Sequence, residues 1–139
     1  LIGTSVNAVD WLNDAGWFVD LNAMQNSGER VTLDPEQQLG ILRVVSNVPD
    51  LTACRPAAQS WMYEFDYLTG SYLPLSEGRT IARKISDNNL TAGVRTIRLG
   101  EKVLSLLTDE TGKISSITNV ASQTSVSSVK RVSWRELDE

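Results

Sequence analysis

Apolar and polar residues alternate with a period of two along residues 60–70, whose sequence is S-W-M-Y-E-F-D-Y-L-T-G. This is the side-chain period of a β-strand, in which successive residues point to opposite faces. Trp61, Tyr63 and Phe65 therefore share one face of the predicted strand. Each buried aromatic ring removes roughly 150 to 250 Å² from water, so we expect these three side chains to anchor the core.

Three segments that precede this aromatic strand also have strand-like patterns. Residues 16–21 alternate, which predicts a strand with Trp17 on the buried face. Residues 29–33 resume the alternation before Asp34 and Pro35, and we expect them to pair antiparallel with residues 16–21. Residues 39–45 form a nearly continuous apolar run with β-branched side chains, which favours a central strand.

The second half of the chain consists of short strand-like segments separated by turns. A low-complexity stretch at 121–128, A-S-Q-T-S-V-S-S, is interpreted as a linker. Residues 129–137 are predicted to form a closing strand that inserts Trp134 into the core. The pattern as a whole predicts an all-β chain. The other strands are expected at residues 71–75, 80–85, 91–99, 102–108 and 113–119.

Two predicted turns share the same chemistry. Asp and Thr side chains can bond to turn amides, and Gly tolerates a positive φ. The two Thr-Gly pairs are 42 residues apart, which matches the repeat of a four-stranded propeller blade. We therefore expect antiparallel four-stranded sheets of a partial, modified β-propeller, with blade-like units at about 14–75 and 79–119. The turn residues are Asp66, Thr69 and Gly70 in the first turn and Asp109, Thr111 and Gly112 in the second.

Composition and charge narrow the functional classes. The chain has 139 residues, 41% of them hydrophobic, which is enough for the core of one ordinary domain. Its net charge is −4 and it contains no run of Lys or Arg, so we expect no nucleic-acid partner. No apolar stretch approaches the roughly 18 residues that a transmembrane helix needs. Because the chain begins with Leu1, we expect it to be a piece of a longer protein.

Few residues are available for catalysis or metal binding. The chain has no histidine, and its one cysteine, Cys54, is interpreted as an inert thiol. Asp10, Asn13 and Asp14 come closest to a calcium loop, with residues 87–89 second, but neither supplies enough oxygen ligands. We therefore expect no metal, no cofactor and no enzymatic activity in this segment.

Four fragments taken together resemble the C-terminal β-propeller region of the PilC/PilY family of type IV pilus proteins. Each fragment alone is an ordinary strand or turn, and the resemblance comes from their order and spacing over nearly the whole chain. The fragments are G-W-F-V-D-L at 16–21, S-G-E-R-V at 27–31, S-W-M-Y-E-F-D-Y-L-T-G at 60–70 and R-V-S-W-R-E-L at 131–137.

The resemblance implies a location at the cell surface, at the pilus tip or in the outer membrane or periplasm of a bacterium. It implies roles in pilus assembly, twitching motility and adhesion. The implied partners are the remaining propeller blades, minor pilins or the pilus tip, and a host-cell surface. The family's calcium loop has no counterpart among these residues, so the resemblance transfers no metal ligands.

Two other functional classes remain open from the sequence. One is an enzyme, because quinoprotein dehydrogenase propellers carry similar Asp and Thr-Gly turns. Asp66 or Asp109 could then be taken for catalytic groups, although both are better explained as turn formers. A general β-rich domain could instead bind glycans or proteins through aromatic side chains such as Trp11 or Tyr72.

Overall fold

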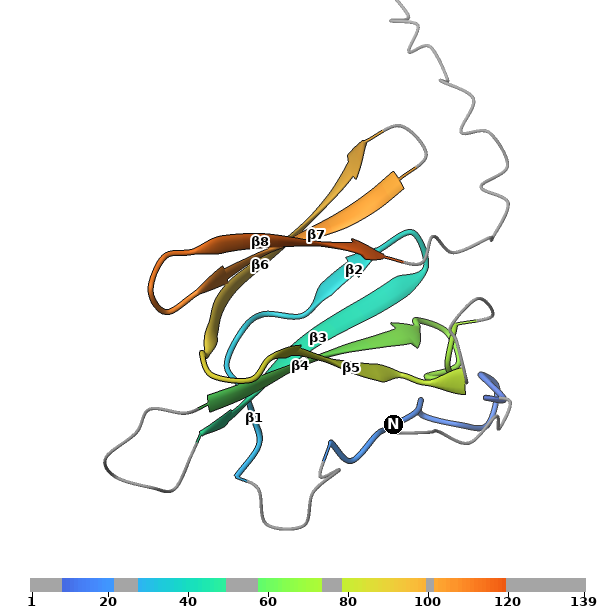
Figure 1. Cartoon of the computed structure of the whole chain (residues 1–139). Helices are drawn as coiled ribbons and strands as arrows, with labels where there is room; N and C mark the ends of the chain where they lie inside the picture. The colour runs from blue at the N-terminus through green and yellow to red at the C-terminus, as the bar shows by residue number, and fades with distance from the viewer. Residues whose placement is uncertain (1–8, 22–27, 50–57, 74–78, 100–101, 120–139) are drawn as a thin grey trace, which may run out of the picture.

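The computed structural model describes residues 9–21, 28–49, 58–73, 79–99 and 102–119. These residues form two antiparallel sheets, one of five strands and one of three, which stack on each other (Figure 1). The prediction of an all-β chain with antiparallel sheets is confirmed for this part, but the predicted four strands per sheet are wrong, because β1 (Arg30–Val31) adds a fifth strand to the first sheet and the second has three. No helix in it is long and apolar enough to cross a membrane. In chain order the strands are β1 (Arg30–Val31), β2 (Glu36–Gln38), β3 (Ile41–Pro49), β4 (Ala58–Asp66), β5 (Ala82–Ser86), β6 (Thr91–Leu99), β7 (Lys102–Asp109) and β8 (Ile114–Asn119).

Strand β3 is the centre of the five-stranded sheet. It pairs with β4 along its whole length. Its other edge is shared by β2, opposite residues 41–43, and by β1, opposite residues 46–47. Pro35, which has no N–H to donate, lies in the break between β1 and β2. The central strand predicted at 39–45 is therefore confirmed, but it is shifted two residues along the chain and extends to Pro49.

The two-residue turn Leu39-Gly40 joins β2 to β3 and explains this shift. Both residues have positive φ angles, 55° and 76°, as a type I′ turn requires. Glycine adopts this conformation freely, whereas the Cβ of leucine crowds the backbone. We expect Leu39→Asn to raise the free energy of unfolding by about 1 kcal/mol, because asparagine tolerates the left-handed region. Urea denaturation measures the change. An equally stable or weaker variant would show that packing of the Leu39 side chain outweighs the strain.

Residues 16–21 do not form a strand, contrary to the prediction. They run across one face of the five-stranded sheet without ladder hydrogen bonds to the other described residues. Their expected partner at 29–33 contributes only β1, which pairs with β3. Trp17 and Leu21 nevertheless pack against the core, while Phe18 between them is 87% exposed. The alternation thus predicts burial correctly and strand pairing wrongly, because burial depends on one face and pairing depends on the edges.

The strand predicted at 71–75, after the turn at residues 66–70, is described only at residues 71–73. Residues 71–73 lie outside any strand, and β5 takes the place beside β4. Strand β5 corresponds to the segment predicted at 80–85. Strand β5 belongs to the first sheet, so the chain passes from the first sheet to the second between β5 and β6. This point comes later in the chain than the boundary between blade-like units predicted near residue 79.

The three-stranded sheet follows the prediction closely. Strand β6 spans the predicted range, and β7 and β8 each differ from theirs by one residue at one end. Strand β7 lies in the middle of this sheet. The predicted linker at 121–128, the closing strand at 129–137 and its Trp134 lie outside the described residues.

The aromatic face of β4 forms the main hydrophobic cluster. Tyr63 and Phe65 are almost fully buried, and Trp61 is partly buried against them. The Tyr63 and Phe65 rings stack with centroids 6.1 Å apart. Trp17 covers Phe65 at 5.4 Å between centroids. The segment that contains Trp17 therefore closes this side of the sheet.

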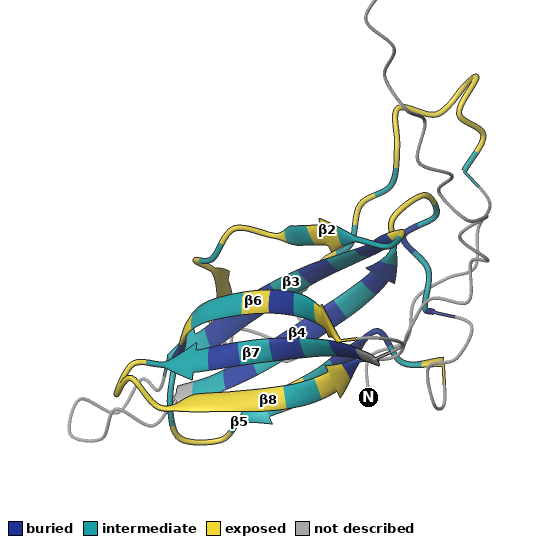
Figure 2. Ribbon diagram, turned by 90° about the horizontal axis from the view of Figure 1, so that it is seen from above, coloured by how far each residue is buried: buried dark blue, intermediate teal, exposed yellow. Residues whose placement is uncertain are grey.

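The opposite face of β4 is buried as well, because the second sheet lies over it (Figure 2). Met62 is 0% exposed, and Val45 lies beside it on β3. Val103 and Leu107 of β7 are also buried. Alternation within one strand distinguishes two faces but does not show that a second sheet will cover the more polar one.

A buried polar network fixes the two sheets to each other at the start of β6. The Asn47 side chain donates to the Thr91 carbonyl at 3.0 Å and accepts from the Thr91 amide at 3.0 Å. The Ser60 hydroxyl donates to Asn47 Oδ1 at 2.6 Å and accepts from the Thr91 amide at 2.9 Å. Because each buried polar group has a partner, the network sets the position of β6 without the cost of unpaired groups.

Candidate functional site

The predicted turn after β4 is held by one carboxylate. Asp66 Oδ1 accepts from the amides of Leu68 and Thr69, both at 3.0 Å, and from the Thr69 hydroxyl at 3.0 Å. Gly70 has a φ of 66° and donates its amide to the Asp66 carbonyl at 2.9 Å. Asp66 thus satisfies the turn amides, which is the role expected of a turn former.

Gly70 also makes room for Trp17. A Cβ at this position would lie 2.4 Å from Trp17 Cδ2, well inside van der Waals contact. The Trp17 indole N–H donates to the Tyr67 carbonyl at 3.1 Å. The turn and the tryptophan therefore form one packed unit, which local turn chemistry does not predict.

The second predicted turn, after β7, uses the same chemistry. Asp109 Oδ1 accepts from the Thr111 amide at 2.9 Å, from the Thr111 hydroxyl at 2.6 Å and from the Lys113 amide at 3.0 Å. Its other oxygen accepts from the Asn89 side chain at 2.9 Å. Gly112 has a φ of 83°. Asn89 lies in the connection between β5 and β6, so this turn is bonded to the point where the chain passes from one sheet to the other.

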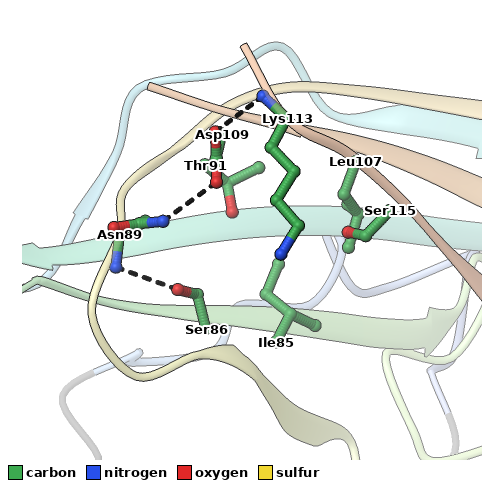
Figure 3. A pocket seen from close by; sticks show the side chains of 8 residues that line it. All are labelled: Ile85, Ser86, Asn89, Thr91, Leu107, Asp109, Lys113 and Ser115. Atoms are coloured by element: carbon green, nitrogen blue, oxygen red, sulfur yellow. Dashed lines mark hydrogen bonds between the residues drawn. The ribbon is translucent and has the colours of Figure 1, made fainter. Parts of the chain in front are cut away.

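A polar cavity of about 220 Å³ opens beside this turn (Figure 3). It lies where the β5–β6 connection faces β7 and β8. The Lys113 side chain extends from the turn toward Ile85, and the amide of Asn89 donates to the Ser86 hydroxyl at 3.0 Å. The lining residues are Ile85, Ser86, Asn89, Thr91, Leu107, Asp109, Lys113 and Ser115.

The chemistry of this cavity favours a structural role for Asp109. The hydrogen bond from the Thr111 hydroxyl, followed by bonds from the Lys113 amide, Asn89 and the Thr111 amide, lowers the pKa of Asp109 despite the opposing effect of desolvation. A carboxylate that already accepts four hydrogen bonds and has a lowered pKa is a poor general base. The geometry therefore explains Asp109 as the holder of the turn.

The lowered pKa of Asp109 predicts how the stability of the fold depends on pH. A carboxyl whose pKa is lower in the folded state stabilises the fold above its unfolded pKa, and this contribution is lost as the pH falls through the folded value. We expect Asp109→Asn to have a lower free energy of unfolding than the parent chain at pH 7. The difference in free energy of unfolding between the two should become smaller below about pH 4. Urea denaturation at pH 7, 5 and 3 measures this. A difference that stays constant across the series would contradict it.

The candidate calcium residues near the N-terminus bond to one another. Asp10 Oδ2 accepts from the Asn13 side chain at 2.6 Å, Asp10 Oδ1 accepts from the Leu12 amide at 3.1 Å, and Asp14 Oδ2 accepts from the Asp10 amide at 2.8 Å. These oxygens complete a tight turn. Within the described ranges, no group of three or more Asp, Glu, His or Cys residues is arranged to hold a metal ion.

The exposed aromatics considered for ligand stacking have different environments. Trp11 is 56% exposed. Tyr72 packs partly against the core cluster, and the Arg79 guanidinium lies 5.8 Å from its ring centroid. Trp61 is likewise covered by Lys84 at 5.4 Å. Of these aromatic rings, Trp11 is the most available to an external ligand.

Glu29 is a site residue that the sequence does not reveal. Its Oε1 accepts hydrogen bonds from the Tyr63 hydroxyl at 2.6 Å and from the Ser46 hydroxyl, and the Leu21 carbonyl lies 3.3 Å from the same tyrosine oxygen. Burial first, and then the bond to Glu29, raise the pKa of Tyr63 well above its usual value. Tyr63 therefore remains a hydrogen-bond donor that ties the N-terminal segment to the core. The sequence hint of a buried polar partner near Glu29 is Ser46, a polar residue next to the apolar residues of β3.

Comparisons of the chain with protein-family models, with curated proteins and with solved structures give no match. A functional assignment therefore depends on the geometry above and on the sequence resemblance.

Proposed function

We propose that the chain is a non-catalytic structural module of a β-propeller in a PilC/PilY-type protein, where it supports type IV pilus assembly, twitching motility and surface attachment. In this proposal the chain contributes two adjacent blades to the propeller. Its partners are the neighbouring blades and, through them, minor pilins or the pilus tip and a host surface. Its location is the bacterial cell surface, at the pilus tip or in the outer membrane or periplasm.

The observation that best supports the proposal is the repetition of one structural unit. Strands β2 to β5 form one antiparallel meander, and β6 to β8 form a second that stacks on it. In each meander, an Asp and Thr-Gly turn follows the strand before the last. Successive four-stranded meanders stacked face to face are the building plan of a propeller.

The second meander has three strands, and the proposal assigns its fourth to residues 129–137. Strands β6 and β8 each pair only with β7 among the described strands. An edge strand presents N–H and C=O groups that gain by pairing with another strand. We expect residues 129–137 to provide that pairing at one of these two edges.

A structural role also explains how the candidate catalytic carboxylates are used. Asp66 and Asp109 each accept three or more hydrogen bonds from their own turns. These hydrogen bonds are all made within the chain, and this favours a structural role for both carboxylates over quinoprotein-like catalysis.

Removal of residues 129–139 from the parent protein in its bacterium tests the proposal. We expect surface pili, counted by electron microscopy, and twitching motility to be lost while the protein is still produced. A matched variant that replaces residues 121–128 with a Gly/Ser sequence of equal length should keep both, because a linker acts through its length. Normal pili after the deletion would contradict the scaffold role.

A further inference from the structure

Strand β8 is an edge strand without the usual protection against pairing. Its sequence, I-S-S-I-T-N, contains no charged residue, proline or glycine, and its pairing with β7 has no shift of register. Proteins usually protect an exposed edge with charged side chains, proline or bulges. On the side away from β7, none of the described strands pairs with it. This side of β8, called here its open edge, is therefore suited to pairing with a further strand.

The backbone hydrogen bonds show which amides face the open edge. In an antiparallel pair, successive residues alternate between facing the partner strand and facing away from it. The Lys113 carbonyl accepts from the Asp109 amide of β7, so the next residue, Ile114, faces away, as do Ser116 and Thr118. The Thr118 carbonyl agrees with this, since it accepts from an arginine side chain of β5 at 3.4 Å.

The other edge of this sheet, on β6, is partly occupied by side chains of the first sheet. The Thr96 amide donates to Glu36 Oε2 at 2.8 Å, and the amide and carbonyl of Thr91 are bonded to Asn47. The pairing of β6 with β7 also shifts register between Thr91 and Gly93, and β6 carries two arginines. A further strand would have to displace these side-chain bonds. Of the two edges, β8 is thus the one that can accept it.

We propose that the C-terminal segment (residues 129–137) pairs with β8, so that the second sheet has the order β6-β7-β8-C-terminal segment. This inference rests on the proposed function, which assigns the fourth strand to this segment without choosing its edge. Residues 120–128 are the whole connection between β8 and the segment. A parallel strand needs a crossover of about a dozen residues or more, so the pairing is antiparallel.

The side chains of β8 favour this occupant. Ser115 lines the polar cavity, so its neighbour Ile114 points to the other face of the sheet, where it is 67% exposed. Val132 and Trp134 share one face of the predicted C-terminal strand. Antiparallel pairing can place them beside Ile114, and apolar pairs of this kind across two strands stabilise a sheet. The segment would then cover a hydrophobic side chain that the described residues leave exposed.

Amide hydrogen exchange, measured by NMR on the full chain and on a chain that ends at residue 128, tests this placement. We expect the amides of Ile114 and Ser116 to exchange at least about tenfold faster after the deletion, because they lose their acceptors. Those of Ser115 and Ile117 face β7 and should keep their protection, which shows that the sheet remains folded. Equal exchange of Ile114 and Ser116 in the two chains would overturn the proposal.

Two proline substitutions in the full chain distinguish the edges. Ser116→Pro removes an N–H that faces away from β7, and Val94→Pro does the same on β6, two positions before Thr96. We expect trypsin to cleave after Lys130 about tenfold faster in Ser116→Pro, because the C-terminal segment is released. Cleavage in Val94→Pro should be as slow as in the parent chain. The opposite result would place the segment on β6, and rapid cleavage in the parent chain would show that it is unpaired; either would overturn the proposal.

Dilution tests the alternative occupant, a second copy of the chain. Protection of the Ile114 and Ser116 amides that does not depend on protein concentration supports pairing within one chain. Protection that falls on dilution would assign the open edge to a second copy and overturn the proposal. These measurements use the purified chain, so their outcome is separate from the pilus counts. Loss of pili after deletion of residues 129–139, with unchanged exchange at β8, would contradict the placement and leave the scaffold role standing.

Discussion

Tyr63→Ala is expected to lower the free energy of unfolding by about 3 to 5 kcal/mol, the range typical of aromatic truncation in a packed core. Tyr63 is 0% exposed, stacks on Phe65 and donates to Glu29. The variant loses the buried ring and leaves the Glu29 carboxylate with fewer partners. Trp61→Ala should cost less, because Trp61 is only partly buried. Urea denaturation of the 139-residue chain measures both.

Phe18→Ala is the matched control for this prediction. It removes an aromatic ring of similar size from a position that is 87% exposed, so stability should change by no more than about 0.5 kcal/mol. If Tyr63→Ala and Phe18→Ala had equal effects, the aromatic face of β4 would not be the main core of the chain.

Gly70→Ala is expected to be the second most destabilising change, at about 2 to 4 kcal/mol. The substitution adds the strain of a left-handed residue at a φ of 66° to a clash of the new Cβ with Trp17. Trp17 is packed on Phe65 and bonded to the Tyr67 carbonyl, so it cannot move aside without losing those contacts. We expect its fluorescence to shift toward that of a solvent-exposed indole, although the other tryptophans make the change partial.

Two variants separate the clash from the strain. Gly112→Ala introduces the same side chain at a φ of 83° with nothing within 4 Å, so it should cost only about 1 to 2 kcal/mol. In a Trp17→Ala background, Gly70→Ala should fall to the cost of Gly112→Ala, because the obstructing ring is gone. If both glycine substitutions cost the same in the parent chain, Trp17 is not held against the turn.

Local chemistry explains what the sequence predicts well. The turns at Asp66 and Asp109 involve residues within four positions of each other, and their bonds follow from side-chain and backbone geometry alone. The aromatic alternation in β4 similarly predicts Tyr63 and Phe65 as a buried face. These features need no knowledge of which segments meet.

The features that were not predicted depend on contacts between distant segments. Asn47 bonds to Thr91 across 44 positions and Glu29 to Tyr63 across 34. A buried arginine at position 43 interrupts an apolar run, and its partner Glu64 becomes evident only when β3 and β4 are aligned. Pairing of β5 with β4 likewise depends on a connection whose course the sequence pattern does not define.

The most direct measurement of the proposed role compares, in living bacteria, a variant that disrupts the core with variants that change a polar group and keep the core. Surface pili are counted in bacteria whose parent protein carries Tyr63→Ala, Tyr63→Phe or Lys113→Met. Tyr63→Phe keeps the buried ring, and Lys113→Met removes the charged group of the polar cavity without altering the core. The scaffold role predicts that pili are lost with Tyr63→Ala and retained with the other two. Normal piliation with Tyr63→Ala, or its loss with a stably folded Lys113→Met, would contradict it.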